Sequence, residues 1–95
     1  MTENELKRNV LRDAYANGWA VYHVAQIRHM RGVRGATAVG YPDLTLARDK
    51  EVMWFELKQE KGALSPEQVR WQSDLPAYHV IRPSDYPHRV AELLA

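Results

Sequence analysis

The chain contains two acidic residues and a lysine whose types and spacing suit metal-assisted chemistry: Asp43, Glu56 and Lys58. Two carboxylates held a few ångströms apart repel each other unless a divalent cation lies between them, and oxygen ligands favour Mg²⁺ or Mn²⁺. A neighbouring ammonium group can orient a water nucleophile or stabilise developing negative charge. This set is typical of metal-assisted phosphodiester hydrolysis, although Glu56 and Lys58 alone would equally fit an ion pair at a frayed strand end.

A predicted β-hairpin brings these residues together. Segments 43–48 and 52–59 have strand character, and the polar residues 49–51 between them have turn chemistry. Counting outward from the turn places Asp43 opposite the segment 56–58. Side chains two residues apart on a strand share a face, so the two ionisable residues of the second strand point the same way. The carboxylates and the lysine are therefore expected at one end of the hairpin.

The pattern Pro42-Asp43, followed by Glu56-Leu57-Lys58, resembles the PD-(D/E)xK nuclease motif. The longer set of segments 40–44, 55–58 and 62–68 is similar to the VRR-NUC branch of that superfamily, and the likeness covers nearly the whole chain. In this family the acidic residues bind metal and the lysine assists catalysis.

The resemblance implies a role for each residue of the motif. Asp43, Glu56 and the backbone carbonyl of Leu57 are expected to bind Mg²⁺ or Mn²⁺. Lys58 is expected to position the attacking water or help to deprotonate it. The expected products carry a 5′-phosphate and a 3′-hydroxyl.

The family also places a glutamate of the first helix at the active site, and Glu3 and Glu5 are the candidates. Glu3 lies three and seven residues before Leu6 and Val10, which predicts that it shares their buried face. Glu5 has an alternative explanation as the capping-box partner of Thr2. We therefore expect Glu3 to bind the metal directly or through water, while an acid at a helix N-terminus can also simply complement the helix dipole.

Gln68 has two interpretations. In the first it is the capping-box glutamine that returns to Ser65 at the start of the second helix. In the second it is the family's glutamine that reaches the active site. We expect the two roles to require different side-chain poses, and the resemblance favours the catalytic one.

The element order predicted along the chain is αβββαβα, in a single domain spanning residues 1–95. Helices are expected at about 3–17 and 66–75, with a short terminal helix capped by Ser84 or Asp85. Further strands are expected at 19–25 and 78–82. The expected fold class is α/β, with a central mixed sheet of about four strands flanked by helices, and the resemblance implies a restriction-endonuclease-like core. The tryptophans Trp19, Trp54 and Trp71 are expected in the core.

Basic residues are concentrated in one stretch of the chain. Between Asp13 and Asp43 the sequence has no acidic residue. The stretch contains Arg28, Arg31 and Arg34, and together with Lys61 these are the predicted contacts to the DNA backbone, although a solvated loop explains them equally well.

The composition excludes several classes of protein. The chain has 95 residues and a net charge of +1. It contains no cysteine, so disulfide frameworks and cysteine-based metal sites are excluded. The histidines show no metal-ligand spacing. No apolar run approaches the roughly 20 residues that span a bilayer, and the N-terminus lacks the pattern of a signal peptide. We expect a cytoplasmic protein, in a bacterial cell or a phage-infected host, with no membrane partner.

The expected function is a structure-selective DNA endonuclease. The resemblance implies branched DNA such as Holliday junctions as the substrate, because small VRR-NUC domains of the stand-alone phage and bacterial type are similar in fold to Holliday-junction resolvases. A chain this small has little surface for reading bases, and a four-way junction needs two coordinated cuts, which favours a homodimer. The edge strand 78–82 or the apolar side of the last helix is the expected interface. The alternatives are a non-catalytic DNA-binding or assembly module with the same fold, and a monomeric nicking or flap nuclease.

Overall fold

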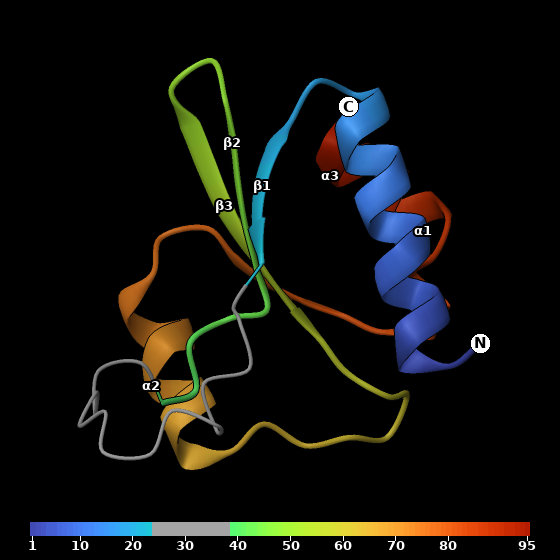
Figure 1. Ribbon diagram of the computed structural model, residues 1–95. Coiled ribbons are helices and arrows are strands. Elements are labelled where there is room, and N and C mark those ends of the chain that lie inside the picture. Colours follow the sequence, from blue (N-terminus) through green and yellow to red (C-terminus); the bar gives the residue numbers. More distant parts are fainter. Residues whose placement is uncertain (24–38) are drawn as a thin grey trace.

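The computed structural model describes residues 1–23 and 39–95 of the chain. An open sheet with the strand order β1-β2-β3-β4 forms its centre, and only β3 and β4 are parallel. Helices α1 and α3 lie on one side of the sheet and α2 on the other (Figure 1). The elements are α1 (Glu3–Ala16), β1 (Ala20–His23), β2 (Leu44–Arg48), β3 (Glu51–Leu57), α2 (Pro66–Asp74), β4 (Tyr78–Ile81), a 3₁₀ turn η2 (Pro83–Asp85) and α3 (His88–Leu94). The α/β class, the mixed four-stranded sheet and the order of its elements are as predicted.

The β2–β3 hairpin closes in a tighter turn than the sequence pattern predicted. Asp49 and Lys50 both have positive φ angles, 51° and 69°, and they are the two residues between the strands. Two consecutive positive φ angles define the type I′ turn, whose twist matches that of the flanking strands. Leu44 then pairs with Phe55. Continuing this register by one residue away from the turn sets Asp43 opposite Glu56, the first residue of the predicted segment 56–58.

The hydrophobic core lies between the sheet and the helices α1 and α3. Leu6, Val10 and Ala14 of α1 are fully buried, as their helical spacing requires. Alternate strand residues supply the other half, because side chains on a strand point to opposite faces in turn. The remaining buried members of this core are Trp19, Leu44, Leu46, Met53, Phe55, Leu57, Ile81, Val90 and Leu94.

Aromatic side chains attach α2 to the opposite face of the sheet. Tyr41 packs edge-on against Trp71 of α2, with ring centroids 4.9 Å apart, and its hydroxyl accepts a hydrogen bond from Nε1 of Trp54 (2.9 Å). Nε1 of Trp71 donates to the carbonyl of Val39 (2.9 Å). Trp54 and Trp71 are therefore only partly buried and lie outside the core cluster, so the core assignment is right for Trp19 and wrong for these two.

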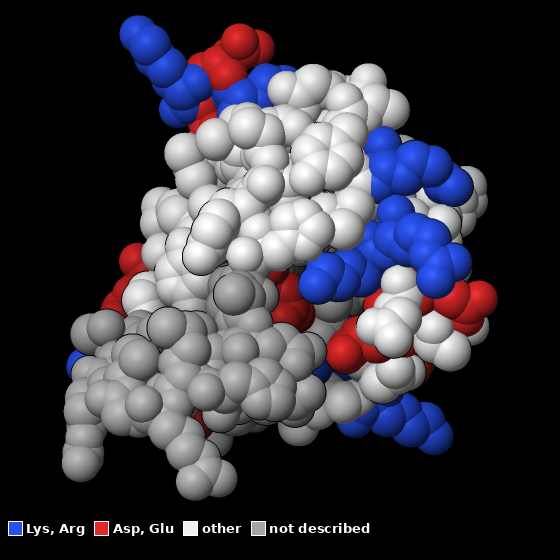
Figure 2. Space-filling view, in the orientation of Figure 1, with Lys and Arg blue, Asp and Glu red and all other residues white. Residues whose placement is uncertain are grey.

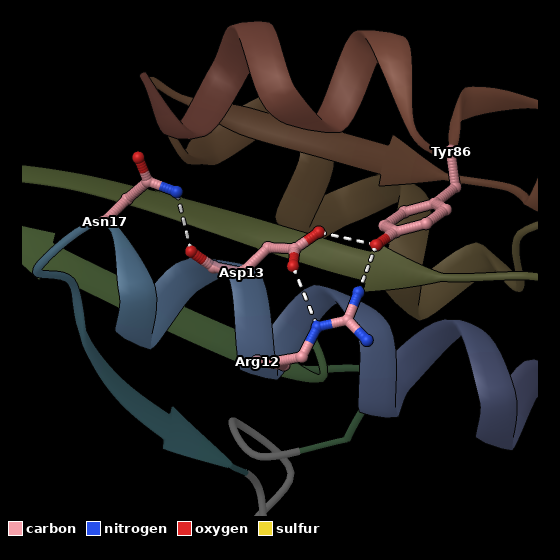
Figure 3. Close-up of polar contacts among 4 residues, drawn as sticks. All are labelled: Arg12, Asp13, Asn17 and Tyr86. Atoms are coloured by element: carbon pink, nitrogen blue, oxygen red, sulfur yellow. Dashed lines mark hydrogen bonds and ion pairs between the residues drawn. The ribbon is translucent and has the colours of Figure 1, made fainter.

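The C-terminal segment differs from its prediction. Asp85 belongs to η2, where its carboxylate accepts the N–H of Arg82 (2.7 Å), and α3 begins only at His88. Neither Ser84 nor Asp85 caps this helix. A hydrogen-bonded group joins the segment to α1: the hydroxyl of Tyr86 donates to Oδ2 of Asp13 (2.6 Å) and accepts from Arg12 (2.7 Å), as Figure 3 shows.

No helix in the described ranges 1–23 and 39–95 has the length and apolarity needed to cross a membrane.

Candidate metal and nuclease site

Asp43 and Glu56 meet where β2 begins and β3 ends. Oδ2 of Asp43 accepts a hydrogen bond from the backbone N–H of Leu57 (2.9 Å), which fixes the Asp43 carboxylate against the last residues of β3. Glu56 lies on the face of the sheet that faces α2, because its neighbours Phe55 and Leu57 point into the core. The hairpin therefore brings together the two carboxylates that the sequence pattern selected.

Glu56 is the buried ionisable residue of this site. Its side chain is 3% exposed, and its Oε1 atom is buried with no hydrogen-bond partner among the described residues. Burial, and after it the negative charge of Asp43, raise the pKa of Glu56 to about 8, while the charge of Lys58 acts in the opposite direction. Without a compensating cation, this carboxyl group therefore tends to retain its proton at neutral pH.

Gln68 reaches the site while it also caps α2. Its Nε2 donates to Oε2 of Glu56 (3.0 Å), and its Oε1 accepts the backbone N–H of Ser65 (2.8 Å). The backbone N–H of Gln68 in turn donates to Oγ of Ser65 (3.2 Å), which completes the capping box. The expectation that the two roles need different poses is wrong, because the two ends of one amide perform them together.

Lys58 follows β3 directly and is half-buried. Its backbone N–H donates to the carbonyl of Ile81 (3.0 Å), which continues the pairing of β3 with β4 beyond the strand. Its positive charge lowers the pKa of Glu56, an effect that burial and the charge of Asp43 outweigh.

Glu3 does not occupy the buried position that its spacing predicted. Its side chain is exposed at the first residue of α1, whereas Leu6 and Val10 are fully buried. Glu3 lies in the first turn of α1, three residues before the first buried residue of the helix. Glu5 fulfils its alternative role, because Oε1 of Glu5 accepts the N–H of Thr2 (2.8 Å) and the backbone N–H of Glu5 donates to the Thr2 hydroxyl (3.1 Å).

The donor set suits a hard cation that retains water ligands. Among the described residues, no group of three or more acidic, histidine or cysteine side chains is placed to hold a metal ion, so Glu3 does not form a third ligand with Asp43 and Glu56. Mg²⁺ commonly binds through one or two carboxylates, several waters and substrate phosphates. Oε1 of Glu56, which has no partner in the part of the chain that the structure describes and lies beside a second carboxylate, fits such an ion.

The predicted DNA contacts lie mostly outside the described ranges. Arg28, Arg31 and Arg34 fall in segment 24–38, and Lys61 is exposed in the connection between β3 and α2. Figure 2 shows further lysine and arginine side chains along the side of the molecule on which α1 lies. The basic residues of α1, which the sequence analysis did not select, are Lys7, Arg8 and Arg12.

Tyr78 is a neighbour of the site that the sequence analysis also missed. It pairs with Trp54 in the parallel β3–β4 register, so its side chain lies on the α2 face of the sheet. Burial, followed by the negative charges of Glu56 and Asp43, raises the pKa of Tyr78 to about 12. The sequence did not indicate that Tyr78 lies near Glu56, because this depends on the register of β4 against β3. That register is set by the long connection through α2.

Comparison with protein-family models, curated proteins and solved structures finds no match to this chain.

Proposed function

We propose that this protein is a Mg²⁺- or Mn²⁺-dependent nuclease that hydrolyses phosphodiester bonds in DNA, with a site of the PD-(D/E)xK kind. The observation that supports the proposal best is the environment of Glu56. It is a buried carboxyl group with one oxygen bonded to Gln68 and a second carboxylate beside it, and its other oxygen has no hydrogen-bond partner within residues 1–23 and 39–95. Leaving a buried polar atom unpaired costs roughly 1–3 kcal/mol, so such atoms often mark functional sites.

Each residue of the site has its own proposed role. Asp43 and Glu56, with the backbone carbonyl of Leu57, would hold the cation. When bound, the cation supplies charge stabilisation and a more acidic water. Lys58 orients the attacking water and stabilises negative charge that develops on the phosphate. Glu3 is exposed and is not grouped with the two carboxylates among the described residues, so we give it no role in the hydrolytic step.

The proposed substrate is branched DNA, such as a Holliday junction. Contacts to phosphates position DNA without reading its sequence, and a chain of 95 residues has little surface for base contacts.

Paired cuts in a four-way junction call for a homodimer. The apolar residues Val90 and Leu94 of α3 are buried in the chain's own core, and Arg89 donates to the outward carbonyl of Val80 on the β4 edge (2.8 Å). The interface therefore has to lie elsewhere than on the apolar side of α3.

The test is cleavage of a labelled panel comprising a four-way junction, a splayed arm, a flap, and nicked and linear duplexes, in Mg²⁺, Mn²⁺ or EDTA. We expect metal-dependent cutting by the wild type and none by Asp43→Asn or Lys58→Ala, with unfolding temperatures that show all three proteins folded. Asp74→Asn, the same change at an exposed position of α2, is the matched control and retains activity.

The results separate the proposal from its alternatives. Binding of branched DNA without cleavage would replace the nuclease with a DNA-binding module. Cleavage of flaps or nicks by a protein that sediments as a monomer would replace the resolvase with a nicking or flap nuclease. Wild-type cleavage rates in Asp43→Asn would exclude the assigned site.

A further inference from the structure

The hydroxyl of Tyr78 is buried on the same side of the sheet as the candidate site. Tyr78 pairs with Trp54 and the next-but-one residue, Val80, pairs with Glu56, so the two ionisable side chains belong to neighbouring strands and share a face. The Tyr78 oxygen has no hydrogen-bond partner among the described residues. A tyrosine hydroxyl that is withdrawn from water normally finds such a partner.

Glu56 presents the complementary atom. The only two buried side-chain polar atoms without a partner in the described part of the chain are the hydroxyl of Tyr78 and Oε1 of Glu56. The hydroxyl can donate a hydrogen bond, and Oε1 can accept one when the carboxyl group is ionised. Tyr78 and Glu56 are diagonal neighbours on one face of the parallel β3–β4 pair, and the charge of Glu56 contributes to the raised pKa of Tyr78, yet the two side chains form no direct hydrogen bond. One water molecule between them would satisfy both atoms.

We propose that Tyr78 is a positioning residue of this site, whose hydroxyl donates a hydrogen bond to a water molecule that also bonds to Oε1 of Glu56. Gln68 from α2 and Tyr78 from β4 then hold the two oxygens of Glu56 from different elements. A carboxylate oxygen has more than one lone pair, so Oε1 can accept this bond and still face a cation. The bond itself does not depend on metal, whereas its effect on cation binding rests on the proposed function.

The experiment compares Tyr78→Phe with the wild type and with Tyr15→Phe, a matched loss of a hydroxyl from a side chain that is 55% exposed. In EDTA, carbon-13 NMR of the Glu56 side-chain carboxyl group and the unfolding temperature report on the bond. Mn²⁺ affinity, measured by calorimetry on the same proteins, reports on its consequence for the metal.

We expect Tyr78→Phe to move the Glu56 carboxyl resonance, to lower the unfolding temperature and to weaken Mn²⁺ binding by about 10-fold or more, as is usual when a partner of a metal ligand is removed. Tyr15→Phe should change none of these. An unmoved carboxyl resonance in Tyr78→Phe overturns the proposal, whatever the unfolding temperature.

The metal measurement separates this proposal from the proposed function. If the wild type binds no Mn²⁺ but Tyr78→Phe moves the resonance, the positioning bond stands and the metal site fails. If the wild type binds Mn²⁺ and Tyr78→Phe binds it equally well, the positioning role fails and the metal site stands.

Discussion

Gln68 donates a hydrogen bond to Glu56 over 3.0 Å, and the opposite end of the same amide accepts a bond from the first residue before α2. One side chain therefore defines where the helix begins and how the buried carboxyl group is oriented. The capping box is common in proteins, but here its third residue also reaches across to β3. The geometry of the site depends on α2 being in place.

Replacing Gln68 with alanine should affect both stability and the site. The variant loses the cap and leaves the Oε2 atom of Glu56 without its donor, which should lower the free energy of unfolding by about 1–3 kcal/mol. Loss of a hydrogen-bonding partner of a metal ligand should slow cleavage by about 10-fold or more. Urea unfolding and the junction cleavage rate measure the two effects.

The control for Gln68→Ala is Glu5→Ala, which removes the equivalent residue from the capping box of α1. It should lower stability by about 1 kcal/mol and leave cleavage unchanged, because α1 packs on the opposite face of the sheet. Cleavage at the wild-type rate by Gln68→Ala would mean that its bond to Glu56 has no functional role.

Glu56 should make the metal-free protein less stable as the pH rises. Its pKa is about 8 in the folded protein against 4.5 as the ordinary value, so between these pH values the folded state binds more protons than the unfolded state. The free energy of unfolding then falls from pH 4.5 to pH 8. His79 contributes with the opposite sign, since burial lowers its pKa.

The difference between the wild type and Glu56→Gln isolates this contribution. In EDTA, Glu56→Gln should lack the decline in stability between pH 4.5 and pH 8, whereas the exposed control Glu92→Gln should retain it. Unfolding by urea at a series of pH values gives both curves. Parallel curves for the wild type and Glu56→Gln would show that Glu56 is ionised in the folded protein.

Local sequence patterns predicted most of the elements. Both capping boxes define helix starts at Glu3 and Pro66, and the alternation of polar and apolar residues defines the hairpin. These signals act over three or four residues, so they need no knowledge of the tertiary fold. The pairing of Asp43 with the end of β3 followed from the same local counting.

The features that depend on distant contacts could not be predicted. Tyr78 comes near Glu56 only because β4 runs parallel to β3, and the position of Trp54 depends on how α2 packs through Tyr41. Glu3 has the periodicity of a buried residue, but it is the first residue of α1 and its side chain is exposed. Periodicity identifies the face of an element, whereas burial also depends on where its neighbour ends.

Arg82 should stabilise the connection between β3 and α2. Its Nη1 atom donates to the carbonyls of Gln59 (2.7 Å), Glu60 (3.2 Å) and Gly62 (2.7 Å). Because a charged donor strengthens such bonds, Arg82→Ala should lower the free energy of unfolding by about 1.5–3 kcal/mol. The exposed residue Arg70 of α2 is the matched control, and Arg70→Ala should change stability by less than about 0.5 kcal/mol. Equal stability losses in the two variants would show that these bonds contribute nothing specific.

Gly40 lies where the chain before β2 touches the start of α2. Its φ angle is +77°, and a methyl group there would lie 2.7 Å from Cβ of Glu67 and 2.9 Å from the backbone carbonyl carbon of the same residue. Gly18 has a similar φ of +82°, but the nearest atom to its added methyl group is 3.9 Å away, on the side chain of Arg48. The two glycines share the backbone strain that a side chain would bring, and differ in the space available.

Gly18→Ala should therefore cost about 1–2 kcal/mol through the left-handed backbone alone. Gly40→Ala should cost about 1–3 kcal/mol more, because the clash is with backbone that must move. That movement displaces the first turn of α2 and with it Gln68, so cleavage should fall in Gly40→Ala and persist in Gly18→Ala. Equal losses of stability, with cleavage intact in both, would mean that α2 can shift without disturbing Glu56, and the proposed dependence of the site on the position of α2 would be wrong.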